Sequence, residues 1–83
     1  MKPVEWQEHI TIDPNVCHGK PCIKGTRIMV SILLDYLRGG ETFSEVLRQY
    51  PTLTEDDIRA ALDYAAWLAR EEEQQPLHTV PTT

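Results

Sequence analysis

Two breaks in the apolar half of the sequence do most to limit how this chain can fold. The glycine pair at 39–40 accepts the left-handed conformation that ends a helix, and the residue before Pro51 avoids helical geometry. These breaks separate three apolar segments, of which the first two are too short to be stable as isolated helices. The segments must therefore pack on one another, which predicts a three-helix domain.

The pattern inside each segment indicates where its helix begins and ends. Residues 30–38 are apolar on most sides, which is typical of a central core helix. The second helix begins at Thr42, which forms a capping-box pattern with Glu45. Its apolar residues then fall on one helical face, at Phe43, Val46, Leu47 and Tyr50.

The third predicted helix begins at Thr54, a good N-cap residue, and continues to about Glu73. Helical spacing predicts a core stripe made of Ile58, Ala61, Leu62, Ala65 and Ala69. The same spacing places Ala60, Tyr64 and Trp67 away from that stripe. Exposed Trp and Tyr side chains are common anchors of protein interfaces, so Tyr64 and Trp67 are predicted partner or dimer contacts. The alternative is that other parts of the same chain cover this side of the helix.

The N-terminal part of the chain predicts a small β element. Residues 9–12 alternate and are β-branched at Ile10, Thr11 and Ile12, and residues 26–28 could form a second short strand. Strands this short must pack on the helices or pair with another chain. We therefore expect the edge of the first strand, with Ile10 and Ile12, to join two copies in a homodimer.

The expected fold class is mainly α, a three-helix, helix-turn-helix domain with a short N-terminal β element. The tight connection at residues 50–53 favours this form, although a plain three-helix bundle without a nucleic-acid role fits the pattern equally well. One domain is expected over residues 1–73. Residues 74–83 show no periodicity and are expected to form a flexible tail.

The distribution of charge indicates which part of the chain could contact DNA. The net charge is −5, and the first turn of the third helix carries three adjacent carboxylates at 55–57. A recognition helix places this turn against the DNA, where carboxylates are repelled. If DNA is bound, we expect the basic segment to bind its phosphates through Lys20, Lys24 and Arg27.

No motif indicates catalysis or a cofactor, so we do not expect an enzyme. Cys17, His18 and Cys22 are close enough in sequence to raise the question of zinc, but only His9 and the distant His78 could complete four ligands. Two reduced loop thiols are the favoured interpretation. The first residues lack a signal-peptide core and no apolar stretch is long enough to cross a bilayer, which favours a cytoplasmic protein.

Several sequence blocks resemble the bacterial family called domain of unknown function 433. These blocks are His9–Pro14, Cys17–Pro21 and Ile23–Ile28, with further matches at 36–37, 39–40, 50–51, 53–54 and 58–65. The resemblance covers about residues 9–68. It implies a homeodomain-like helix-turn-helix fold and dimers joined through the N-terminal strand. It also implies similarity to VapB-type antitoxins, which pair with a PIN-like ribonuclease toxin encoded nearby.

These observations together predict an antitoxin-like protein that binds a PIN-like toxin and its own operator DNA. Two alternatives stay open: a DNA-binding regulator without a toxin, and a stand-alone dimeric interaction domain. One departure from the antitoxin pattern concerns the end of the chain. Antitoxin tails often insert basic residues into the toxin's carboxylate site, whereas no Arg or Lys follows Arg70.

Overall fold

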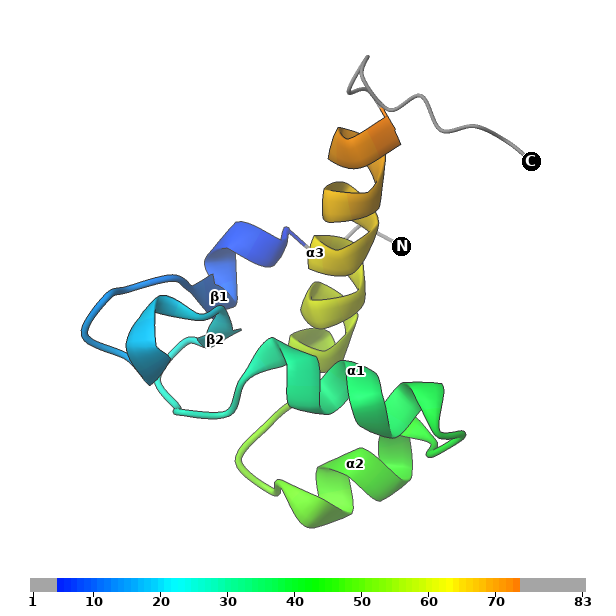
Figure 1. Ribbon diagram of the computed structural model, residues 1–83. Coiled ribbons are helices and arrows are strands. Elements are labelled where there is room, and N and C mark those ends of the chain that lie inside the picture. The colour runs from blue at the N-terminus through cyan, green and yellow to red at the C-terminus, as the bar shows by residue number, and fades with distance from the viewer. Residues whose placement is uncertain (1–4, 74–83) are drawn as a thin grey trace.

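The computed structural model describes residues 5–73 and consists of three helices that follow a small antiparallel sheet (Figure 1). The helices are α1 (Val30–Arg38), α2 (Phe43–Gln49) and α3 (Glu55–Glu73). The strands are β1 (Ile10–Thr11) and β2 (Cys22–Ile23), and short 3-10 helices precede each of them, η1 (Trp6–Glu8) and η2 (Cys17–Gly19). The predicted mainly α fold is confirmed, whereas the predicted flexible tail lies outside the described residues.

The helix boundaries follow the breaks in the sequence. Gly40 adopts a φ of 97°, which a residue with a side chain rarely tolerates, and the turn there separates α1 from α2. Thr42 forms the predicted capping box, since its hydroxyl accepts a hydrogen bond from the backbone N–H of Glu45 at 3.2 Å. A second reciprocal cap starts α3, where the Thr54 hydroxyl accepts from the N–H of Asp57 and the Thr54 N–H donates to its carboxylate. Both helices are thus fixed at their N-termini.

The cap of α2 makes stability depend on pH in a predictable direction. Hydrogen bonds from the backbone and hydroxyl of Thr42 lower the pKa of Glu45 from its usual 4.5. Because the pKa is lower in the folded chain, the ionised carboxylate stabilises the fold above pH 4.5, and this contribution is lost as pH falls through the folded-state pKa. Thermal unfolding of Glu45→Gln is therefore expected to vary less with acid than that of the wild type. An identical acid dependence of both proteins would contradict this.

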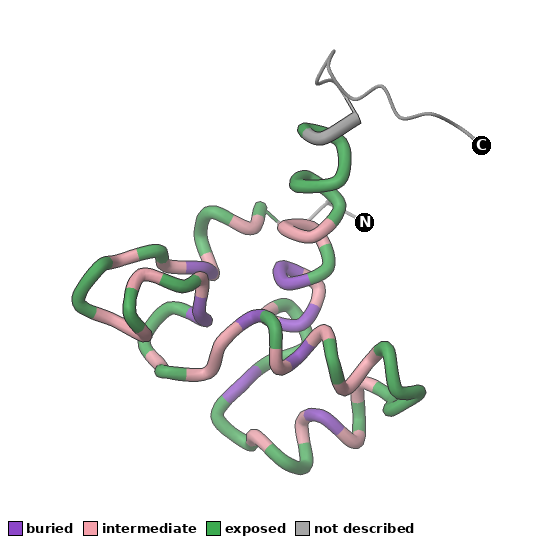
Figure 2. The backbone as a smooth tube through the Cα atoms, viewed as in Figure 1, coloured by how far each residue is buried: buried purple, intermediate pink, exposed green. Residues whose placement is uncertain are grey.

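The hydrophobic core lies where the strands, α1, α2 and the first half of α3 meet (Figure 2). Its largest fully buried side chains are Ile23, Leu33, Val46 and Ile58. Figure 2 also shows that α3 extends beyond the rest of the described chain, where residues 66–71 are exposed. The core therefore holds α3 by one half and leaves the other half accessible.

The second strand differs from the prediction. It is formed by Cys22–Ile23 and not by residues 26–28, and Ile10 pairs with Ile23 in antiparallel register. The chain reverses after β2 because Gly25 takes a φ of 81° and the Thr26 hydroxyl donates to the carbonyl of Ile23 at 2.8 Å. β1 therefore has a partner strand in its own chain. In the part of the chain that the structure describes, no strand lies on the other edge of β1.

The buried face of α3 also differs from the predicted stripe. Ile58 and Ala61 are buried as expected, but Leu62 and Ala69 are exposed, while Ala60 is fully buried. The physical reason is that η1 packs along α3 and covers a second side of the helix. As a result, the buried side of α3 includes Ala60 and leaves Leu62 exposed.

Candidate functional site

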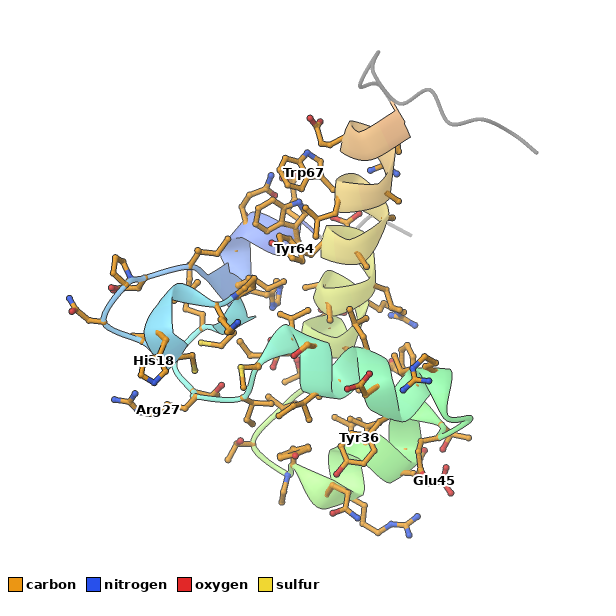
Figure 3. All side chains as sticks on the ribbon, in the orientation of Figure 1. His18, Arg27, Tyr36, Glu45, Tyr64 and Trp67 are labelled. Atoms are coloured by element: carbon orange, nitrogen blue, oxygen red, sulfur yellow. The ribbon has the colours of Figure 1, made fainter. Side chains whose placement is uncertain are left out.

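The predicted contact residues Tyr64 and Trp67 belong to an aromatic cluster with Trp6 (Figure 3). The ring centroid of Trp6 lies 4.9 Å from that of Tyr64, at an interplanar angle of 71°, and 5.3 Å from that of Trp67. Edge-to-face and tilted pairs of this kind stabilise a fold beyond the area they bury. The alternative stated for this side of the helix is therefore what the structure shows: η1 covers part of it. Sequence reasoning missed Trp6, because nothing in its spacing pointed to α3.

Residues 62–69 of α3 are apolar on nearly every side, and four charged residues follow them. We call residues 62–69 the projecting segment; Asp63 is its only charged residue. Leu62, Trp67 and Leu68 are 41%, 37% and 43% exposed, and Ala66 and Ala69 are exposed as well. A helix that is apolar around its circumference is normally buried. Among the described residues 5–73, it is the side facing η1 that the chain itself covers.

The first turn of α3 is acidic and its carboxylates are already engaged. Asp57 caps the helix through Thr54, and its other oxygen lies 2.9 Å from Nδ1 of His9. Glu55 and Asp56 remain exposed and lie 3.7 and 3.9 Å from Arg59. This end of α3 therefore presents negative charge, and its nearby cation is held by two carboxylates.

The predicted DNA-contacting residues lie on the loops that flank β2. Lys20, Lys24 and Arg27 are all exposed. Figure 3 places Arg27 beside His18 on the side of the molecule away from α3. We call these four residues the basic face. Lys24 lies nearest to the acidic start of α3, since its N–H donates to the carbonyl of His9 at 2.8 Å and the His9 ring lies 2.9 Å from Asp57.

The predicted dimer residues fall into two different environments. Ile10 is buried in the chain's own core, which corrects its assignment as an interface side chain. Alternation along β1 points Ile10 inward, and Ile12 lies beyond the strand and is 53% exposed. Of the pair, only Ile12 is available to another molecule.

Cys17 lies in the loop that joins the strands, and Cys22 is the first residue of β2. Cys17 is partly exposed and Cys22 is buried, and both are free thiols. Within residues 5–73, no group of three or more His, Cys, Asp or Glu side chains is placed to hold a metal ion. His78, one residue named for the zinc alternative, lies outside that range. None of the described helices is both long and apolar enough to span a bilayer.

Comparison with known proteins now gives the family. The family model described as protein of unknown function (DUF433) matches residues 10–65. A crystal structure of a DUF433 member protein from Anabaena variabilis ATCC 29413 is similar to this chain, with 37% sequence identity and a TM-score of 0.71. The similarity covers 82% of this chain and 67% of that one. No curated protein matches the chain. Because the matched model spans the sheet, α1, α2 and half of α3, the chain belongs to the DUF433 family.

Proposed function

We propose that this protein is the antitoxin-like half of a toxin–antitoxin pair and that α3 binds the toxin. The observation that supports this proposal is the projecting segment, a helical surface that is apolar on nearly every side and exposed. Large exposed apolar surfaces on small proteins commonly mark protein-binding sites. The role is therefore that of a binding protein and not of an enzyme.

The proposed mode of binding is a helix in an apolar groove of the partner. Trp67 and Leu68 would anchor one side of the helix, and Leu62 would anchor the opposite side. Arg70 follows directly after this segment and is exposed, so it would be available to a carboxylate of a partner bound there. Neutralisation in this proposal depends on the helix and not on a basic tail.

The test is co-expression with the product of the neighbouring gene, which this proposal expects to be a ribonuclease. Stable co-purification and loss of RNA cleavage in the complex are the expected results, and cleavage should return when Leu62→Glu and Leu68→Glu are combined. These exposed positions are suited to the test, because charges there should leave the isolated fold intact. A neighbouring ribonuclease that neither binds nor loses activity would contradict the proposal.

We also propose that two copies join through the outer edge of β1. In the described chain this edge has no strand beside it, and exposed edges favour pairing with another chain. The exposed Ile12 lies at the end of that edge. Sedimentation should give a dimer for the wild type and a weaker dimer for Ile12→Lys. A monomer at micromolar concentration would exclude this interface.

Operator binding is a second candidate function, supported by the exposure of every side chain in the basic face. Reversing charge at Lys20, Lys24 and Arg27 is expected to abolish a gel shift with the protein's own promoter DNA. The matched control is Glu55→Gln with Asp56→Asn, which removes negative charge from α3 and should keep or strengthen binding. Asp57 is left unchanged because it caps the helix. Loss of binding in the control alone would show that α3, and not the basic face, contacts DNA.

A further inference from the structure

The two cysteine sulfurs lie on the same short stretch of backbone. Sγ of Cys17 is 3.4 Å from the carbonyl oxygen of Arg27, and Sγ of Cys22 is 3.5 Å from that of Thr26. These carbonyls belong to consecutive residues, so both thiols converge on one turn. The loop between the cysteines doubles back, since the N–H of Lys20 donates to the carbonyl of Cys17 at 3.0 Å.

The thiols differ in accessibility. Cys17 is partly exposed, whereas Cys22 is fully buried in β2. Burial is the largest cause that raises the pKa of the Cys22 thiol, and a hydrogen bond with the Cys17 thiol is the second. An oxidant from solution therefore meets Cys17 first, while Cys22 stays protonated and lies on the same turn.

We propose that Cys17 and Cys22 form a reversible intramolecular disulfide when the protein meets a peroxide. The Cys17 thiolate attacks one peroxide oxygen, the O–O bond breaks, and Cys17 becomes a sulfenic acid while hydroxide or alkoxide leaves. The Cys22 sulfur then attacks the Cys17 sulfur, an S–S bond forms, and the sulfenic oxygen leaves as water with the Cys22 proton. Two thiols are oxidised and one peroxide is reduced.

The disulfide would form next to the basic face, because Cys17 precedes His18 and its sulfur contacts the carbonyl of Arg27. Cys17 and His18 both adopt left-handed backbone conformations, with φ of 52° and 56°, so the loop is held in an unusual shape for residues with side chains. A disulfide would fix this loop, which carries His18 and Lys20, and would remove the thiol donors from the carbonyls of Thr26 and Arg27. The proposal does not depend on toxin binding.

The test measures whether folding favours the disulfide. The intact protein is equilibrated in glutathione redox buffers with and without urea, and the fraction of intramolecular disulfide is read from thiol alkylation and mass. Because the fold holds both sulfurs on one turn, the equilibrium constant for the bond should be about tenfold or more higher in the folded chain. If the equilibrium constant for disulfide formation is equal or lower in the folded chain, the proposal is overturned. This holds also where the constant is lower because oxidation unfolds the protein.

Single variants test the order of the steps. After peroxide, dimedone should label Cys17 in folded Cys22→Ser but label the wild type hardly at all, because Cys22 consumes the sulfenic acid first. Folded Cys17→Ser should leave Cys22 unmodified, since that thiol is buried. Equal dimedone labelling of the wild type and Cys22→Ser would overturn the assignment of Cys22 as the resolving thiol.

Discussion

Replacing Ile58 with alanine is expected to lower the free energy of unfolding by about 3 kcal/mol, within the roughly 2–5 kcal/mol range for such truncations in protein cores. Ile58 is fully buried where α3 meets the other elements, so the change would leave a cavity in the core. Small domains have little stability in reserve. The variant should therefore be partly unfolded at room temperature.

The control for this prediction is Leu62→Ala, one helical turn further along α3. Leu62 was expected in the core from its spacing, but it is exposed in the structure. Its truncation should change the free energy of unfolding by about 0.5 kcal/mol or less. Urea denaturation of both variants measures the difference. Equal losses would mean that α3 buries the face that the spacing first suggested.

Replacing Trp67 with alanine is expected to weaken binding of the proposed toxin about thirtyfold, or about 2 kcal/mol. Trp67 is the largest exposed side chain of the projecting segment and also contacts Trp6. Because part of its surface is already in water, the isolated protein should lose only about 1 kcal/mol of stability, less than the 3–5 kcal/mol typical of a buried Trp. Calorimetric titration and thermal unfolding give the two quantities.

Trp6→Ala is the matched control, because Trp6 belongs to the same aromatic cluster but lies on η1 and not on α3. It should reduce stability at least as much as Trp67→Ala while changing partner affinity less. If Trp67→Ala instead collapses the fold, Trp67 belongs to the chain's own core or to a dimer seam. Its assignment as a toxin contact would then be withdrawn.

The three helices could be predicted because their boundaries depend on local chemistry. Gly40, Thr42 and Thr54 act on their immediate neighbours, and the structure places helix ends at all three. The second strand was misplaced because β-propensity favoured residues 26–28. The turn at Gly25 instead allows Cys22–Ile23 to pair with β1. Propensity and turn geometry competed there, and the turn decided the outcome.

The candidate surfaces were predicted less completely, because they depend on contacts between distant parts of the chain. Helical spacing correctly grouped Tyr64 with Trp67, but it could not show that Trp6 would pack on them. Without knowledge of this contact, helical spacing assigned Leu62 to the core and Ala60 to the outside. The structure shows the reverse, since Ala60 is buried and Leu62 is exposed. The side that a long helix buries is set by its neighbours, and one of them here comes from the start of the chain.

The bond between His9 and Asp57 has a consequence for how the chain opens. Asp57 holds the first turn of α3 through Thr54 with one oxygen and meets His9, the residue before β1, with the other. Local opening at one of these elements therefore removes a hydrogen bond from the other, which favours a single cooperative unit over independent fraying. Any molecule that pulls β1 outward would also loosen the start of α3, so an event at the N-terminal edge would be transmitted mechanically to the helix.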